Sequence, residues 1–118
     1  MIDTTEFEAI VGERRRMAAD RLAGIEADLA AVRAARSDAA GADDEHDPEG
    51  ATTSGEWSRL AGLRRQTVAE IEELALAAER LAAGSYGVCA VCGAEIPEGR
   101  LRALPAATRC VACADRSR

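Results

Sequence analysis

The cysteines form two close pairs, and their spacing limits the fold more than any other feature of the sequence. Each pair has the form C-x2-C, seventeen residues separate the pairs, and there is no fifth cysteine; the four are Cys89, Cys92, Cys110 and Cys113. Two such pairs, about 15 to 20 residues apart, supply four thiolates from two tight turns, a ligand set that zinc prefers. The spacing therefore predicts a C4 zinc-finger module with these four residues as metal ligands.

Other uses of four cysteines are a redox dithiol, an iron–sulfur cluster, or free structural thiols. A redox pair normally occurs singly on a larger fold, whereas spacing alone does not exclude a cluster. Four thiolates leave no open position for water or substrate, so a zinc ion here is structural and not catalytic.

The segment between the two pairs predicts a small ribbon. It has a turn at residues 97–99 and short apolar positions at Ile96, Leu101 and Leu104. Gly93, directly behind the first pair, is expected to let the backbone turn closely around the metal where a Cβ would crowd it. We expect this ribbon to be too thin to fold without its ion.

Two long helices are predicted before the cysteines, from about Thr5 to Ser37 and from about Ser54 to Ala83. In both, apolar residues recur at intervals of three and four, as in a coiled-coil seam. The seam residues are Leu22, Ile25, Leu29 and Val32 in the first helix, and Trp57, Leu60, Val68, Ile71, Leu74, Ala78 and Leu81 in the second.

Local signals mark the ends of these helices. Residues 5–8 and 53–56 have the capping-box form, in which a threonine and a glutamate satisfy free backbone N–H groups at a helix start. Gly84 follows the second helix and is expected to cap its C-terminus with a positive φ.

The composition favours long packed helices over a thick globular core. Of the 118 residues, 27 are alanine, and there is one Phe, one Trp and one Tyr. Alanine supplies helix propensity but little apolar area. We therefore predict a mainly α protein: an antiparallel two-helix coiled-coil hairpin over residues 1–83, with helices of roughly 45 Å, and a C4 zinc finger over residues 84–118.

Charge is unevenly distributed. The net charge is -6, which argues against a general electrostatic grip on nucleic acid. Seven acids and no Lys or Arg lie between Ser37 and Glu56, so we predict an acidic loop at about 38–55 at the tip of the hairpin. This loop is a functional fingertip, a second metal site that includes His46, or a solvated linker. Trp57 is expected to pack at the base of the tip.

Nothing at the N-terminus has the form of a secretory signal, and no window is apolar enough to span a membrane. We therefore expect a cytoplasmic protein, a compartment in which paired cysteines favour metal over disulfides. No nucleophile is paired with a histidine outside the acidic segment and no Gly-rich phosphate loop is present, so we do not expect an enzyme.

Residues 80–114 carry a specific set of motifs around the cysteines. These are a glycine and Tyr-Gly before the first cysteine, C-x2-C-G, an isoleucine, Arg-Leu, Ala-x-Pro and the second C-x2-C. Besides the cysteines, the residues are Gly84, Tyr86, Gly87, Gly93, Ile96, Arg100, Leu101, Ala103 and Pro105. With these motifs the segment resembles the DksA/TraR family of bacterial transcription regulators.

The resemblance implies a function that composition does not give. It implies a protein that binds RNA polymerase without sequence-specific DNA binding, inserts its coiled-coil hairpin into the secondary channel, and modulates transcription initiation. The basic residues through which longer family members depend on ppGpp find no match in this chain, which has no lysine, so we do not extend the resemblance to that effector.

The tip departs from the family's best-known pattern, D-x-x-D-x-A. Aligned on Asp-Pro, Asp47 matches the first aspartate, but Gly50 and Thr52 occupy the places of the second aspartate and the alanine. A shifted alignment pairs Asp44 with Asp47 and puts Glu49 where alanine belongs. The candidate partner-binding residues at the tip are therefore Asp44, Asp47 and Glu49.

Two alternatives to a polymerase-binding regulator remain open. One is a zinc-ribbon adaptor or structural protein that keeps the family fold without acting through the channel. The other is a thiol-based redox sensor, since zinc-bound thiolates are oxidised where they are exposed.

Overall fold

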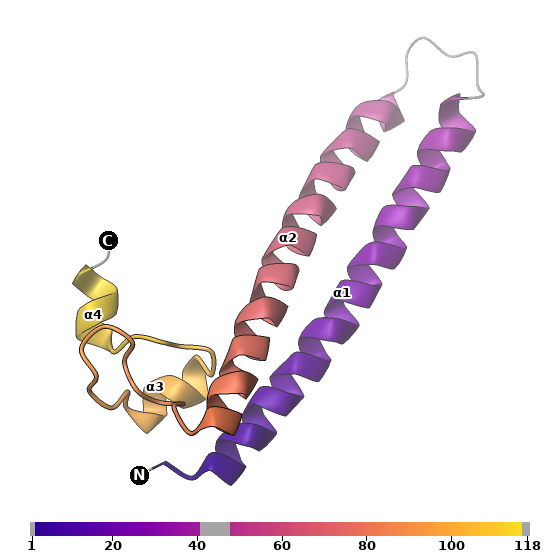
Figure 1. Ribbon diagram of the computed structural model, residues 1–118. Coiled ribbons are helices and arrows are strands. Elements are labelled where there is room, and N and C mark those ends of the chain that lie inside the picture. The colour runs from indigo at the N-terminus through magenta and orange to yellow at the C-terminus, as the bar shows by residue number, and fades with distance from the viewer. Residues whose placement is uncertain (1, 41–47, 117–118) are drawn as a thin grey trace. The chain divides into compact units, whose positions relative to one another are not determined.

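The structure is a computed structural model that describes the backbone of residues 2–40 and 48–116. Its helices are α1 (Thr4–Ala40), α2 (Pro48–Ala83), α3 (Glu98–Ala103) and α4 (Val111–Arg116) (Figure 1). One isolated antiparallel bridge joins Val88 and Glu95. The predicted fold class, a mainly α hairpin followed by a C-terminal cysteine module, is confirmed. No helix in the described ranges is both long and apolar enough to cross a membrane.

The chain forms two compact units. We call Met1–Met17 together with Ile71–Arg118 the finger unit, and Ala18–Glu70 the hairpin unit. Both α1 and α2 contribute residues to each unit. The division predicted from the sequence, 1–83 and 84–118, stays a prediction about domains.

The cap of α1 differs from the predicted one. The Asp3 carboxylate accepts hydrogen bonds from the backbone N–H groups of Thr5, at 3.0 Å, and Glu6, at 3.4 Å. Asp3 is therefore the N-cap, and the prediction of a capping box starting at Thr5 is wrong. Aspartate caps a helix as well as threonine does, and its charge also interacts favourably with the helix dipole.

The start of α2 also differs from the prediction. The helix begins at Pro48, so Thr53–Glu56 lies inside it and is not a capping box. Proline is favoured at the first helical position because its φ is already helical and its missing N–H has no partner to lose there. Since α1 also continues to Ala40, the predicted loop is helical wherever the structure describes it; residues 41–47 lie outside the described ranges.

In the hairpin unit the two helices run antiparallel. Arg21 pairs with Glu70 at 2.7 Å, and Arg64 with Glu26 at 3.3 Å, so the partner on α2 moves toward the N-terminus as the position on α1 advances. Further along, Arg36 donates to the Ser54 hydroxyl at 3.1 Å. These pairs fix the register of the predicted hairpin.

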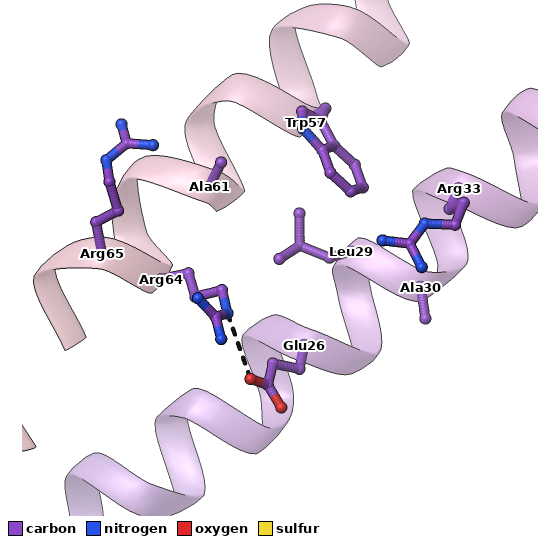
Figure 2. Close-up of a pocket in the computed structure, with 8 residues that line it drawn as sticks. All are labelled: Glu26, Leu29, Ala30, Arg33, Trp57, Ala61, Arg64 and Arg65. Atoms are coloured by element: carbon purple, nitrogen blue, oxygen red, sulfur yellow. Dashed lines mark hydrogen bonds and ion pairs between the residues drawn. The ribbon is translucent and has the colours of Figure 1, made fainter. Parts of the chain in front are cut away.

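The seam of the hairpin unit buries a few large side chains. Ile25, Leu29 and Leu60 form a buried cluster, and Val32 and Trp57 pack against it. These are all predicted seam residues. Trp57 packs in the seam well inside α2, which begins at Pro48, and its expected place at the base of the tip stays a prediction because residues 41–47 lie outside the described ranges. Figure 2 shows Trp57 and Leu29 facing each other across the helices.

A polar side chain also lies in this seam. Thr67 is only 4% exposed, and its hydroxyl donates to the Leu63 carbonyl of its own helix at 2.8 Å. Because this bond lies within one helix, the buried hydroxyl needs no partner from the other helix.

The finger unit has a core built from three stretches of chain. Phe7 and Val11 come from α1, Leu74, Ala77 and Leu81 from α2, and Tyr86, Ile96 and Leu101 from the cysteine module. The Phe7 and Tyr86 rings are 5.5 Å apart and tilted by 43°. The sequence seam began at Leu22 and so missed Phe7 and Val11, although their spacing of four inside a predicted helix was a usable signal.

Candidate metal centre

A tight turn at the end of α2 leads the chain into the cysteine module. Gly84 has a φ of 78°, as predicted, and its N–H bonds to the Leu81 carbonyl at 3.4 Å. The N–H of Ser85 bonds to the Arg80 carbonyl at 2.9 Å. These two bonds form a Schellman motif, which satisfies the last free carbonyls of the helix and reverses the chain.

Tyr86 and Gly87 attach the first cysteine loop to the core. The buried Tyr86 hydroxyl donates to the Pro105 carbonyl at 2.7 Å, which links the two halves of the module. Burial raises the pKa of Tyr86, and the nearby Arg80 charge opposes this shift. Gly87 has a φ of 84°, and a Cβ on it would lie 3.0 Å from the Ile2 side chain, so glycine is required for both conformation and space.

The first cysteine pair lies in a turn closed by backbone bonds. The N–H of Cys89 bonds to the Ala94 carbonyl at 2.8 Å, and the N–H of Gly93 bonds to the Cys89 carbonyl at 3.0 Å. Gly93 has a φ of 76°, but a Cβ there would meet nothing within 4 Å. No protein atom would therefore crowd a side chain at Gly93, and its backbone conformation explains the glycine, whereas the expected crowding against the metal stays a prediction.

The second cysteine pair opens α4. The Cys110 carbonyl accepts from the Ala114 N–H at 2.9 Å, and the Ala90 N–H bonds to the Thr108 carbonyl at 2.8 Å. This last bond joins the loops that carry the two pairs. Arg100 adds a further bond, from its Nε to the Arg109 carbonyl at 2.9 Å.

The fold brings the four predicted cysteines together. Their Sγ atoms all lie within 4.8 Å of one another, and those of Cys92 and Cys110 are 3.8 Å apart. A zinc–sulfur bond of about 2.3 Å in a tetrahedron gives sulfur–sulfur distances of about 3.8 Å, whereas a disulfide requires about 2.05 Å. All four are free cysteines, and the cluster fits a structural zinc ion.

Without a bound metal, the thiols of Cys89 and Cys113 differ in pKa. Backbone N–H groups, first that of Cys92 and then that of Cys110, lower the pKa of Cys89 to about 6. A hydrogen bond with the Cys110 side chain, followed by burial, raises the pKa of Cys113 to about 12. Four like charges therefore do not coexist in the bare cluster, and metal binding must release protons.

The segment between the pairs is not the predicted ribbon. Residues 98–103 form α3, with Pro97 as N-cap, and the predicted turn at 97–99 is the start of this helix. The Leu101 N–H bonds to the Pro97 carbonyl at 3.1 Å. The helix buries Leu101 completely, whereas Leu104, just past its end, is 52% exposed. A helix of six residues buries one apolar side chain, Leu101. One buried position gives no repeating pattern, so the sequence did not indicate a helix here.

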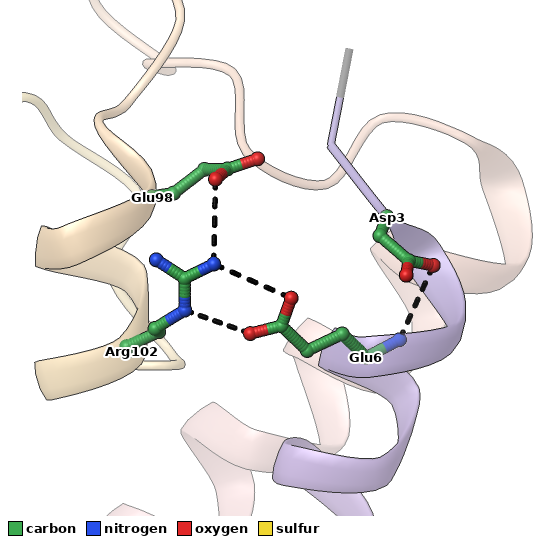
Figure 3. Close-up of polar contacts among 4 residues, drawn as sticks. All are labelled: Asp3, Glu6, Glu98 and Arg102. Carbon is green, nitrogen blue, oxygen red and sulfur yellow. Dashed lines mark hydrogen bonds and ion pairs between the residues drawn. The ribbon is translucent and has the colours of Figure 1, made fainter.

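Arg102 joins α3 to the first turn of α1 (Figure 3). Its Nε donates to Glu6 at 2.7 Å, and its Nη2 contacts Glu6 and Glu98, each at 3.3 Å. The guanidinium also lies 5.8 Å from the centre of the Phe7 ring. The hydrogen bond from Arg102 lowers the pKa of Glu6. Sequence reasoning missed this contact because the partners are far apart in the chain.

The predicted tip residues are not tested by the structure. Asp44, His46 and Asp47 lie outside the described residues, and Glu49 is in the first turn of α2 without a described side chain. Their partner-binding role stays a prediction.

Comparisons with known proteins agree with this geometry. Residues 84–118 match the prokaryotic dksA/traR C4-type zinc finger family. The structure of transcription factor DksA2 from Pseudomonas aeruginosa superposes with a TM-score of 0.81 and 22% sequence identity, over 97% of this chain and 81% of that chain. At this identity the likeness is one of fold.

A curated relative from Aquifex aeolicus (strain VF5), described as an uncharacterized protein, is 41% identical over 56 residues. That match covers 48% of this chain and 39% of the relative, so the chain matches about two fifths of the relative's length. Residues 84–118, which contain the four clustered cysteines, are therefore similar to the prokaryotic dksA/traR C4-type zinc finger, and the fold of the chain is similar to that of DksA2.

Proposed function

We propose that this protein is a bacterial transcription regulator of the DksA/TraR type, not an enzyme, which acts in the cytoplasm by binding RNA polymerase. The observation that carries the proposal is the combination, in one chain, of a hairpin fold that is shared with DksA2 over 97% of this chain and a four-cysteine cluster within the residues that match the C4 zinc finger family. By the family resemblance, the hairpin enters the secondary channel of the polymerase and changes initiation.

In this proposal Cys89, Cys92, Cys110 and Cys113 are the ligands of the structural zinc. The ion supplies a cross-link between the two cysteine turns, which are otherwise joined by few backbone bonds. Tyr86 and Arg100 support the same arrangement, since both donate to carbonyls of the segment between the pairs.

The hairpin supplies reach and charge. Its helices have 37 and 36 residues, enough for about 55 Å of helix each at 1.5 Å per residue. The segment that joins them includes Asp44 and Asp47, and Glu49 follows in the first turn of α2. We propose these three residues as those that act near the catalytic magnesium of the polymerase. Carboxylates placed close to a divalent cation change the electrostatics of its site.

Co-purification with RNA polymerase tests the proposal. We expect the zinc-loaded wild-type protein to be retained by purified polymerase and to change the lifetime of promoter complexes in vitro. Asp44→Asn/Asp47→Asn should reduce the effect on initiation while leaving binding largely intact. Asp20→Asn/Asp28→Asn is the matched control, because it removes two charges from exposed positions of α1. No retention at about micromolar concentration would reject polymerase binding.

A thiol-based sensor is the second candidate, and one observation favours it. Cys92 is exposed and Cys110 is half-buried, so oxidants reach part of the cluster. Peroxide titration with a zinc-release dye distinguishes the two functions. Metal retained under mild oxidant, together with polymerase binding that is insensitive to peroxide, would exclude the sensor.

A further inference from the structure

The hairpin unit carries an open groove of about 500 Å³ between its two helices, which we call the basic groove (Figure 2). Two of its lining residues are alanines, Ala30 and Ala61, whose side chains are short. The lining residues are Glu26, Leu29, Ala30 and Arg33 from α1, and Trp57, Ala61, Arg64 and Arg65 from α2. All of them belong to the hairpin unit, so the groove is defined within one compact unit.

The groove concentrates positive charge on an acidic protein. Its one carboxylate, Glu26, is already paired with Arg64 at 3.3 Å. In the part of the chain that the structure describes, Arg33 and Arg65 make no ion pair with a carboxylate. The net charge of the whole chain is -6, so this local excess of guanidinium groups is not the general character of the surface.

Trp57 contacts the guanidinium groups of Arg33, which lines the groove, and of Arg36, which does not, and it neutralises neither charge. The guanidinium carbons of Arg33 and Arg36 each lie 5.5 Å from the centre of its ring. A cation–π contact uses a face of the guanidinium and leaves N–H groups at its edge available. Those edges match the two oxygens of a carboxylate. The contact therefore presents donors that are both charged and partly ordered.

We propose that the basic groove binds an acidic segment of a protein partner, whose Asp or Glu carboxylates contact Arg33 and Arg65. A nucleic acid is a poorer occupant, because the guanidinium groups already on Trp57 compete with a base for stacking on its ring. The proposal extends the proposed function by adding a second contact surface beside the tip, but its test does not require polymerase.

The fluorescence of Trp57 reports on the groove, because it is the only tryptophan in the chain. We expect a glutamate-rich peptide to give a saturable change in emission at low salt, and the change to disappear at about 0.5 M salt because exposed charges are then screened. Arg33→Gln/Arg65→Gln should weaken the apparent affinity about ten-fold or more. Arg65→Gln alone should weaken it less, and it leaves the arginines on the Trp57 ring in place.

Arg14→Gln/Arg116→Gln is the matched control, since it removes the same charge from positions outside the groove. It should bind the peptide as the wild type does, and circular dichroism should show that all variants keep their helices. Equal weakening by both double variants, or no change with peptide in the wild type, would overturn the proposal. Tighter binding of a single-stranded RNA oligonucleotide than of the peptide would also overturn it, as would a dimer in sedimentation that Arg33→Gln/Arg65→Gln abolishes.

Binding experiments with polymerase distinguish failure of the groove proposal from failure of the proposed function. Loss of affinity in the Arg33→Gln/Arg65→Gln variant, with the control unaffected, would place the acidic segment on the polymerase. If the wild type fails to bind polymerase but binds the peptide through the groove, the proposed function fails while this inference stands.

Discussion

The finger unit and the hairpin unit gain their order in different ways. The finger unit buries large side chains from three stretches of chain, including Phe7 and Leu101 with no exposed area. Among its described residues, the hairpin unit buries a narrow row, Ala18, Ile25, Leu29, Leu60 and Thr67. A two-helix seam leaves most of each helix in water, so its burial per residue is small. Packing and metal therefore stabilise the finger unit, whereas helix propensity and periodic packing stabilise the hairpin unit.

Zinc removal should give the largest difference in stability between the two units. Structural zinc contributes on the order of 10 kcal/mol or more to a small module, so a chelator should unfold the core around Tyr86. Tyr86 is the only tyrosine and Trp57 the only tryptophan, and they report on the finger and hairpin units separately. We expect tyrosinate absorbance to titrate near the ordinary pKa after chelation, with Trp57 emission little changed. Simultaneous loss of both signals would show that the units unfold as one.

Core truncations give the next largest difference. Phe7→Ala should cost about 3–5 kcal/mol, because it leaves a cavity in a core closed by several elements. Leu60→Ala should cost about 2 kcal/mol, near the lower limit for such changes, because the two-helix seam can collapse around the missing side chain. Urea unfolding of the zinc-loaded proteins measures both, and equal costs would contradict the comparison.

Tyr86→Phe tests how much one buried hydrogen bond contributes to the stability of the finger unit. It removes the donor to the buried Pro105 carbonyl and should cost about 1–3 kcal/mol. In the wild type the folded pKa of Tyr86 is raised. The stabilisation is therefore present below the unfolded value of about 10 and is lost as pH rises through the folded pKa. Tyrosinate absorbance that titrates at the ordinary pKa in the folded protein would contradict burial of the ring.

The contact between Arg102 and Glu6 should have the smallest effect, since both groups are exposed to solvent. The folded pKa of Glu6 lies below its ordinary value of 4.5. Its contribution is therefore present above that value and lost as pH falls through the folded pKa. Glu6→Gln should lower the melting temperature slightly at about pH 7 and less at about pH 4. Glu8→Gln is the exposed control on the same helix, and an equal effect in both variants would show that the pairing adds nothing.

The sequence predicted the features that depend on local spacing. The C-x2-C pairs indicated the sulfur cluster, the seam residues Ile25, Leu29 and Leu60 are buried together, and Gly84 has the expected positive φ. The prediction of the first helix cap was wrong because two local signals competed. Asp3 and Thr5 both have good capping side chains, and only the structure shows that Asp3 provides the cap.

Contacts between distant residues could not be predicted in the same way. Arg102 and Glu6, or Arg33 and Trp57, meet because helices pack in one register, and many other arginine partners are compatible with the composition. The same limit explains α3, a helix of six residues whose hydrophobic pattern is too short to distinguish from a turn.

By itself the sequence determined the zinc-finger chemistry and the two long helices, because ligand spacing and helical periodicity act over a few neighbouring residues. Only the tertiary structure decided that Phe7 closes the finger core and that arginines from both helices share one groove. These features depend on which residues become neighbours when the chain folds back, and each such contact gains free energy only after the entropy of closing the chain has been paid.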